Sequence, residues 1–250
     1  MSEDFFSIKN LCITRAGKIL YKNFSLAIEA KKITSLLSPS GSGKTTLFYF
    51  IAELLKNSDA QCFGEIFFSK KNFFSKNQNE NVQKQKARVS FLFQENRLLE
   101  ECSVFKNIFL PLANCFSKSE AKERANFFLE NVFLFHKKNK KARELSGGEK
   151  RRLSLARSLS FPSELLLLDE PFFSQDSQTK KNLMLFVKKI ASEESRTVFF
   201  STHNVDEAVF LSDRIIGLHK NPLEVLFDEK VFAENKNEVH KKILKVLKLY

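Results

Sequence analysis

A run of small residues with one lysine, residues 38–46, most constrains what this chain can fold into. It follows an apolar-rich run at 33–37, which predicts a buried strand, and precedes residues 47–55, which predict a helix. A strand, a small-residue loop and a helix in this order are the context that a phosphate-binding loop requires. The backbone N–H groups of such a loop close around β- and γ-phosphates, and the helix N-terminus adds partial positive charge.

Every position of this loop is a candidate for binding a nucleotide cofactor: Ser38, Pro39, Ser40, Gly41, Ser42, Gly43, Lys44, Thr45 and Thr46. We expect Lys44 to reach the β- and γ-phosphates and the Thr45 hydroxyl to ligate Mg²⁺. The usual pattern begins with Gly, but this chain has Ser38, which precedes a proline and therefore favours extended backbone. A working loop is expected, and a chance match in a Gly/Ser loop is the alternative.

Length and composition suit one large α/β domain. The chain has 250 residues, of which 43% are hydrophobic, enough for a sizeable core. Lys and Arg number 41 and Asp and Glu 29, which gives a formal net charge of +12. This charge is spread along the chain instead of being gathered in one block, so no nucleic-acid partner is expected.

Cysteine usage and the N-terminus indicate a reducing compartment. The thiols of Cys12, Cys62, Cys102 and Cys115 have spacings that fit neither a zinc site nor a redox pair. The acidic start of the chain shows no signal peptide, and no stretch approaches the ~20 apolar residues of a membrane-spanning helix. We expect a cytoplasmic protein whose membrane role, if it has one, comes through a partner.

The hydrophobic pattern predicts strands that alternate with helices. An apolar–polar alternation at 5–28, with a turn at 16–18, predicts an antiparallel sheet, and the polar run 77–86 predicts a solvated loop. Further strands are expected at 62–68, 89–93, 164–168 and 197–200. Helices are expected within 104–135 and at 118–132, 149–159, 179–191 and 205–211. This alternation implies a parallel sheet.

Two carboxylates, Asp169 and Glu170, follow one of these apolar runs. Ligands of open α/β sheets bind at the carboxyl ends of the strands. Because successive strand residues point in opposite directions, Asp169 can serve a Mg²⁺ shell while Glu170 addresses another spot. A carboxylate near a γ-phosphate can orient a water or act as its general base. The alternative is a strand that ends in acidic surface residues.

The run Leu-Ser-Gly-Gly-Glu at 145–149 is the most specific signal of the chain. It stands just before a predicted helix, so Ser146, Gly147 and Gly148 predict a second anion site at a helix N-terminus. A helix cap alone explains Ser146, but a cap does not need both glycines.

These motifs, with Gln94 and the pair Thr202-His203, stand in the order seen in ABC-type ATP-binding subunits, which the chain resembles over about residues 5–219. The resemblance implies an α/β fold of the P-loop NTPase class, with a RecA-like core, an N-terminal antiparallel β subdomain and an inserted helical subdomain. It implies one ABC ATPase domain over 1–250. Its expected parts are a core with the β subdomain at 1–94 and 158–230, a helical subdomain at 95–157, and a C-terminal tail at 231–250.

The resemblance also implies roles for individual residues, with ATP and Mg²⁺ as cofactors. Thr45, Gln94 and Asp169 would form the metal shell, and Gln94 would also sense the attacking water. Glu170 would be the general base and His203 would contact the γ-phosphate.

In this family two subunits sandwich two ATP molecules. The resemblance therefore implies a homodimer, or a pair with a second ABC subunit, in which Ser146, Gly147 and Gly148 contact the nucleotide of the other subunit. Asp176 would belong to the segment that crosses to that subunit.

Some positions depart from the family pattern. Arg15 lies near the place of an adenine-stacking aromatic residue, and a guanidinium can also stack on a ring. Lys31 stands where Gly is common, Arg151 replaces a frequent Gln, and residues 173–176 differ from the usual small-residue segment. We expect these changes to affect rate and coupling more than the fold.

The stretch 93–99 resembles the nitrate, sulfonate and taurine importer group. The resemblance implies an ATPase that drives small-molecule import through a separate integral membrane permease, with a substrate-binding protein as a further partner. Such an ATPase would be a peripheral subunit at the cytoplasmic face of the cell membrane. The alternatives are an ABC exporter or lipoprotein-release ATPase, a soluble non-transport ABC ATPase, and a degenerate regulatory nucleotide binder.

Two segments are candidates for contact with the membrane components. Residues 94–116 would form part of the groove that receives a permease helix, with Phe105, Ile108, Phe109 and Leu110 as contacts or, alternatively, as core residues. The basic, amphipathic stretch 239–250 is expected to dock on its own domain, with a membrane or permease contact as the alternative.

Overall fold

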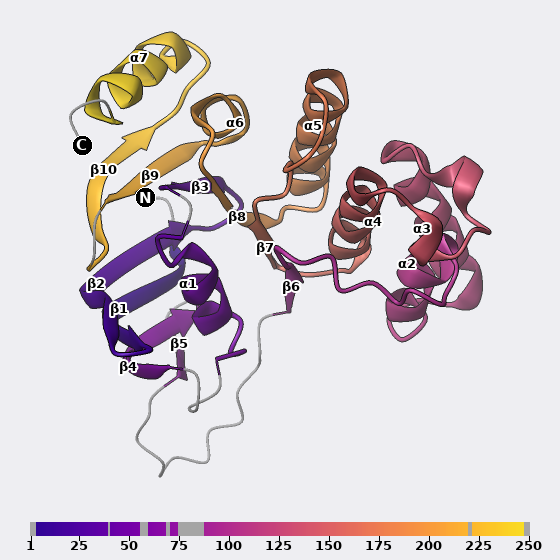
Figure 1. Ribbon diagram of the computed structural model, residues 1–250, viewed down its shortest axis with the longest axis horizontal. Coiled ribbons are helices and arrows are strands. Elements are labelled where there is room, and N and C mark those ends of the chain that lie inside the picture. Colours follow the sequence, from indigo (N-terminus) through magenta and orange to yellow (C-terminus); the bar gives the residue numbers. More distant parts are fainter. Residues whose placement is uncertain are drawn as a thin grey trace.

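The computed structural model describes residues 4–39, 41–55, 60–68, 71–74, 88–219 and 222–247, with the backbone alone for 71–74. Two sheets and a lobe of helices make up this part of the chain (Figure 1). The predicted loop at 77–86, the loop residue Ser40 and the last residues of the amphipathic stretch lie outside the described residues.

The first sheet is antiparallel and has the order β2-β1-β4-β5. Its strands are β1 (Asp4–Arg15), β2 (Lys18–Glu29), β4 (Gln61–Phe68) and β5 (Lys71–Phe74). The predicted turn between the first two strands is confirmed: Ala16 and Gly17 have φ values of 48° and 75°. Two successive positive φ values match the twist of a hairpin, which explains the choice of glycine there.

The second sheet carries the candidate site. Its order is β10-β9-β3-β8-β7-β6, and every neighbouring pair except β9 and β10 is parallel. The predicted parallel sheet is thereby confirmed. The strands are β3 (Ile33–Leu37), β6 (Val89–Leu92), β7 (Leu165–Asp169), β8 (Thr197–Thr202), β9 (Arg214–His219) and β10 (Glu224–Lys230). Strands β3, β7 and β8 are buried at every position, as expected for strands covered on both faces.

Helix α1 (Lys44–Ile51) lies between the two sheets and buries Leu47 and Phe48 against both. The prediction placed this helix at 47–55, which is wrong at both ends. The helix begins directly after Gly43, whose φ of 105° breaks the extended backbone of the loop. It ends at Ile51, and Glu53 then has a φ of 56°. A left-handed residue after the last turn is a common helix stop.

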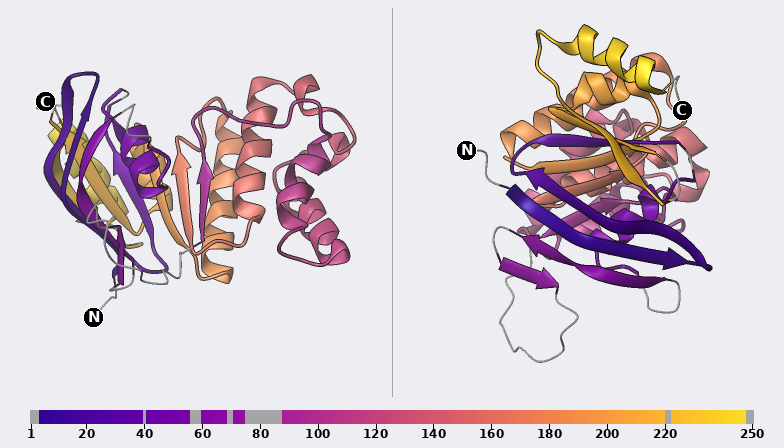
Figure 2. Two further views of the ribbon diagram at one scale, coloured as in Figure 1. Left: turned by 90° about the horizontal axis from the view of Figure 1, so that it is seen from below. Right: turned by 90° about the vertical axis from the view of Figure 1, so that its left-hand side faces the viewer.

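The helical lobe consists of α2 (Val104–Leu112), α3 (Lys118–Asn131) and α4 (Gly147–Ser160), with short 3-10 turns at Phe135–Lys137 and Ala142–Glu144. Figure 2 shows in its left view that this lobe stands at the end of the molecule opposite β1 and β2. A capping box opens α3: the Ser117 hydroxyl accepts from the Glu120 N–H at 3.3 Å, and the Glu120 carboxylate accepts from the Ser117 N–H at 3.0 Å.

Three helices follow the lobe: α5 (Ser177–Glu193), α6 (Val205–Leu211) and α7 (Lys236–Leu247). Val239 and Ile243 of α7 are buried in one apolar cluster with Ala208 and Ile215. This burial confirms that the C-terminal stretch docks on its own domain. In the part of the chain that the structure describes, no helix is long and apolar enough to cross a membrane.

Candidate nucleotide-binding and hydrolysis site

The phosphate-loop candidate connects β3 to α1. Gly41 and Gly43 have φ values of 76° and 105°, which few other residues adopt without strain. The hydroxyl oxygens of Ser38 and Ser42 lie 2.6 Å apart, so a hydrogen bond closes the loop across its width. Ser38 is buried, and its N–H reaches the carbonyl oxygen of Thr202 at 3.4 Å. The serine that replaces the usual first glycine is thus bonded into both the loop and the sheet.

Lys44 begins α1 and curls back over this loop. Its Nζ donates to the carbonyl oxygens of Ser38 at 2.8 Å and Pro39 at 2.9 Å. The side chain is 5% exposed. Burial lowers the pKa of the Lys44 ammonium, while the charges of Glu170 and Asp169 act in the opposite direction. The ammonium therefore sits inside the loop and within the field of the two candidate site carboxylates.

Thr45 and Asp169 are brought together as the predicted metal ligands require. The Thr45 hydroxyl donates to Asp169 Oδ2 at 2.6 Å, and the Ser201 hydroxyl donates to Asp169 Oδ1. A hydroxyl beside a buried carboxylate is an oxygen-only donor set, which suits Mg²⁺. Across the described ranges, no three His, Cys, Asp or Glu residues cluster as metal ligands. An ion at this pair would need further oxygen ligands beyond these two side chains.

Glu170 and His203 meet at the carboxyl edge of the same sheet. His203 Nδ1 lies 3.4 Å from Glu170 Oε1, and the two side chains are 50% and 14% exposed. Glu170 has a φ of 46°, in the left-handed region that costs a residue with a Cβ about 1–2 kcal/mol. Its N–H donates to the Ser201 hydroxyl at 3.0 Å. Strain at a strand end in this position is typical of functional sites.

Sheet register explains why these segments converge. Leu37 pairs with Thr202 and Asp169 pairs with Ser201, which places the phosphate loop, Glu170 and His203 side by side. Strand β6 joins the same edge because Leu92 pairs with Leu168. Gln94 and Glu170 each lie two residues beyond that pair. Gln94, whose side chain is exposed, therefore lies at the same edge of the sheet as the carboxylates.

Ser146, Gly147 and Gly148 lie at the start of α4, and Figures 1 and 2 place α4 and α1 on different sides of β6 and β7. The Ser146 hydroxyl accepts from the Glu149 N–H at 3.4 Å, and the Glu149 carboxylate accepts from the Ser146 N–H at 3.0 Å. Gly148 packs closely: a Cβ added to it would lie 3.2 Å from the Ser174 carbonyl oxygen. The structure thus does not bring these three residues to the phosphate loop of their own subunit.

Arg151 has a role that the sequence analysis missed. Its buried guanidinium bonds to the backbone carbonyl oxygens of Phe93, Gln94, Asp169 and Glu170. Burial lowers the pKa of this guanidinium to about 10, against the opposing charges of Asp169 and Glu170. The available signal was an arginine one turn into the helix that follows the Ser-Gly-Gly run.

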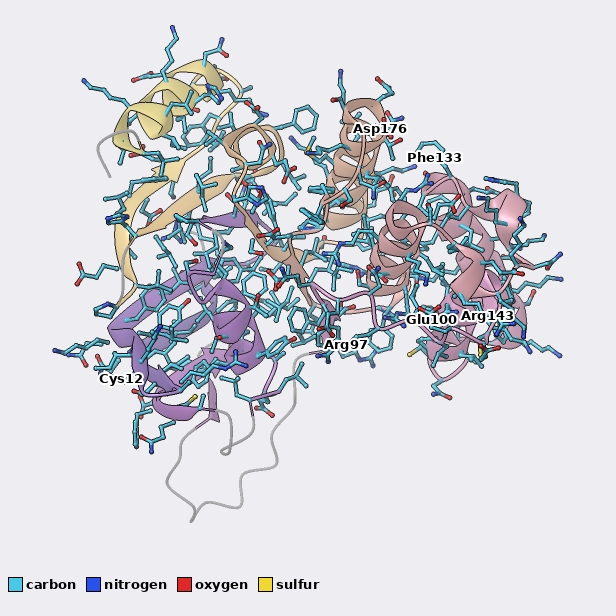
Figure 3. All side chains as sticks on the ribbon, in the orientation of Figure 1. Cys12, Arg97, Glu100, Phe133, Arg143 and Asp176 are labelled. Atoms are coloured by element: carbon cyan, nitrogen blue, oxygen red, sulfur yellow. The ribbon has the colours of Figure 1, made fainter. Side chains whose placement is uncertain are left out.

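Two further arginines lie near the site. Arg15 is exposed, and its Nη1 lies 3.4 Å from the Thr46 hydroxyl at the start of α1, so it neighbours the phosphate loop. Arg97 lies at the junction of the sheet and the helical lobe (Figure 3), with its guanidinium 4.0 Å from the centre of the Phe93 ring.

The proposed permease-contact residues separate into buried and exposed ones. Ile108 is fully buried in the lobe core, so it is a core residue and its assignment as a contact is wrong. Phe105 and Phe109 pack partly buried on that core, with ring centres 5.3 Å apart. Leu110 is 45% exposed.

Comparisons with known proteins agree with this geometry. Residues 21–173 match the family described as "ABC transporter". A phosphonates import ATP-binding protein of Fusobacterium nucleatum is 32% identical over 250 residues, which cover 96% of this chain and 98% of that protein. A sulfate/thiosulfate import ATP-binding protein of Vibrio cholerae is 37% identical over 205 residues, covering 80% of this chain and 52% of that protein. This chain thus spans about half the length of the sulfate/thiosulfate relative.

A solved structure has the same fold. The dimeric ATP-binding cassette MJ0796, bound to ADP and Pi in a post-hydrolysis state, aligns with a TM-score of 0.77 at 28% identity, covering 91% of this chain and 99% of that one. The expected P-loop NTPase fold, an α/β core with an antiparallel sheet and a helical insertion, is confirmed.

Fold and site together define an ATP-binding cassette. The chain belongs to the ABC transporter family, and as a cassette of that family it binds ATP. Its likeness to the nitrate, sulfonate and taurine group stays a resemblance, since the relatives named above import phosphonates and sulfate or thiosulfate.

Proposed function

We propose that this chain is the ATP-hydrolysing subunit of an ABC importer, coupling MgATP binding and hydrolysis to small-molecule import through a separate permease. The observation that carries the proposal is the meeting of three pairs at one sheet edge: Lys44 on its loop carbonyls, Thr45 on Asp169, and His203 beside Glu170. This arrangement supplies a cation, a metal-ligating pair and a carboxylate within one set of adjacent loops.

The chemistry assigned to these residues is in-line attack of water on the γ-phosphate. Lys44 and the loop N–H groups hold the phosphates and stabilise developing charge. Mg²⁺, when bound, would neutralise phosphate charge, held by Thr45 and Asp169 with Gln94 completing the shell. Glu170 takes the water proton or orients the water, and His203 contacts the γ-phosphate.

The subunit is proposed to work as a pair, either with a second copy or with another ABC subunit. The dimeric assembly of the neighbouring cassette structure supports this arrangement. Ser146, Gly147 and Gly148 lie away from their own phosphate loop, and a Cβ added at Gly147 would meet nothing within 4 Å. An open helix N-terminus with a positive dipole end suits the nucleotide of a partner subunit.

The proposed partners are integral membrane permease subunits and a substrate-binding protein, with this chain peripheral at the cytoplasmic face of the membrane. The import function named for both relatives supports the transport role. Those names also indicate oxyanions, so we propose this class first for the cargo. An exporter, a lipoprotein-release ATPase and a soluble ABC ATPase are not favoured by these relatives.

The partners can be tested directly. The tagged chain is purified from gently solubilised membranes of cells that produce it, and the co-purifying proteins are identified by mass spectrometry. Recovery of a multi-spanning permease together with a binding protein is expected. Recovery of ribosomal or nucleic-acid-bound proteins without any permease would contradict the transport role.

A further inference from the structure

Arg151 reaches from the helical lobe to the sheet edge that carries the candidate catalytic groups. It lies on α4, about one helical turn after Gly147, and is 5% exposed. Its Nη1 donates to the carbonyl oxygens of Phe93 and Gln94, and its Nη2 donates to those of Asp169 and Glu170. One rigid, planar group therefore holds the two segments that follow β6 and β7.

These bonds act on the backbone torsions of Glu170. The peptide group between Asp169 and Glu170 is held on both sides, by Arg151 at its carbonyl and by the Ser201 hydroxyl at its N–H. The next carbonyl, that of Glu170, is 2.9 Å from the same Arg151 nitrogen. Because two successive carbonyl oxygens share one donor, the left-handed backbone of Glu170 is fixed from outside the strand.

The hydrogen bonds of Arg151 fix the positions of backbone groups and do not pair its charge with a carboxylate. Among the described residues all four of its acceptors are backbone carbonyl oxygens, and its buried Nε has no hydrogen-bond partner there. A buried cation without a bonded carboxylate carries a desolvation cost that carbonyl dipoles offset only in part. Because of this desolvation cost, Arg151 contributes little net stability to the fold, which favours a role in positioning.

We propose that Arg151 is a positioning residue for hydrolysis. It holds Glu170 in its strained backbone conformation and fixes the backbone of Gln94 beside it, so that both side chains converge on the attacking water. This inference rests on the proposed ATPase function. Since α4 also begins with Gly147 and Gly148, Arg151 ties the position of that helix to the catalytic edge of its own subunit.

Arg157 provides a matched control on the same helix. Its Nη1 donates to the Arg97 carbonyl at 2.9 Å and its Nη2 to the Asn96 carbonyl at 3.2 Å. Burial lowers the pKa of this guanidinium as well. Arg157 therefore makes the same kind of bond from α4, but to backbone beyond Gln94 and not to Asp169 or Glu170.

The test compares the wild type with Arg151→Gln, Arg151→Lys and Arg157→Gln. Both Arg151 variants are expected to lose about tenfold or more in kcat while the Kd of a fluorescent ATP analogue changes less than about threefold. Lysine is not expected to rescue, because one ammonium cannot span carbonyls on two segments. Arg157→Gln is expected to melt at lower temperature with kcat within about twofold of the wild type.

A second readout needs no nucleotide. Hydrogen–deuterium exchange of the nucleotide-free protein is expected to be faster around Glu170 and Gln94 in the Arg151 variants, and unchanged around Glu170 in Arg157→Gln. Thermal melting shows which variants fold. If Arg151→Gln does not fold, the kcat and the exchange rates of Arg151→Lys test the inference.

Folded Arg151 variants whose kcat and hydrogen–deuterium exchange rates equal those of the wild type would overturn the inference. That result would leave the proposed ATPase function unaffected. A wild-type protein without hydrolysis would overturn the proposed function, and the exchange comparison would still decide whether Arg151 holds the Glu170 backbone.

Discussion

The Nδ1 atom of His203 lies 3.4 Å from Oε1 of Glu170, although the two residues belong to loops after different strands. Their strands, β7 and β8, are neighbours in the sheet, and Asp169 pairs with Ser201 just before them. Sheet register therefore creates the pairing of a half-exposed imidazole with a largely buried carboxylate.

From this pairing we predict that His203→Ala lowers kcat by about 100-fold or more, because a group that positions the γ-phosphate and the carboxylate is lost. ATP affinity is expected to change little, since Lys44 and its loop remain. Steady-state phosphate release and equilibrium nucleotide binding measure the two effects separately. A His203→Ala protein with undiminished kcat would remove His203 from the site.

Asp169→Asn is predicted to weaken MgATP binding by about tenfold or more while leaving metal-free ATP binding nearly unchanged. The reason is that the Asp169 carboxylate accepts a hydrogen bond from the Thr45 hydroxyl at 2.6 Å and supplies the negative charge of this Thr45–Asp169 metal-ligand pair. Calorimetric titrations with and without Mg²⁺ test this difference. Ser201→Ala is the control, since it removes a hydrogen bond to the same carboxylate but keeps the charge; equal losses in both variants would argue against a metal role.

Lys31→Gly is predicted to stabilise the fold by about 0.5–1 kcal/mol. Lys31 has a φ of 57°, a conformation that costs a residue with a Cβ about 1–2 kcal/mol, part of which the greater unfolded-state freedom of glycine offsets. The bond from its N–H to the Thr197 hydroxyl, 3.0 Å, does not depend on the side chain. Urea unfolding measures the gain.

Asn10→Gly serves as the control, because Asn10 has a similar φ of 51° and asparagine tolerates that region better than lysine does. A gain at position 10 as large as at position 31 would contradict the strain argument.

Glu149 is predicted to make folding stability depend on pH in acid. Hydrogen bonding from Lys137, with further bonds from Ser146, lowers the pKa of Glu149 to about 2 in the folded state. The unfolded chain therefore binds this proton first. Its contribution, about 1 kcal/mol once solvent screening of the Lys137 pair is allowed for, is complete above the unfolded pKa of about 4.3 and is lost as the pH falls toward 2.

Glu149→Gln is accordingly expected to flatten the fall of stability below about pH 4.5, as measured by denaturant unfolding across pH. Glu120→Gln is the matched control, since Glu120 closes the same kind of capping box at α3 and its pKa is lowered by Ser117 alone. Equal flattening in both variants would exclude the lysine as the dominant cause.

The elements that sequence predicted well are those with a local physical signature. Apolar runs specified β3, β7 and β8, because strands covered on both faces favour apolar side chains along most of their length. Ser117, a residue type that favours helix N-caps, stands directly before the predicted helix at 118–132, and α3 begins there. The order of the motifs carried the family resemblance, which the comparisons confirm; the site residues at the ends of β3, β6, β7 and β8 stay predictions.

The features that sequence did not predict depend on contacts between distant segments. Arg151 bonds to backbone carbonyl oxygens, which every residue has, so its acceptors leave no trace in the sequence. The hydrogen bond between the hydroxyls of Ser38 and Ser42 is likewise visible only in the structure, which shows how the loop closes without its first glycine. The start of α1 was predicted three residues too late, because the glycine-rich loop leads into a helix without a side-chain cap. The sequence therefore carries no local signal for the first residue of this helix.

The most direct test of the central claim compares wild-type protein with Glu170→Gln under saturating MgATP. Phosphate release is measured together with molar mass by light scattering. The account predicts that the variant binds ATP, hydrolyses it at least about 100-fold more slowly because the general base is lost, and accumulates as an ATP-bound dimer. A Glu170→Gln protein that hydrolyses at the wild-type rate, or that stays monomeric with ATP bound, would contradict the account.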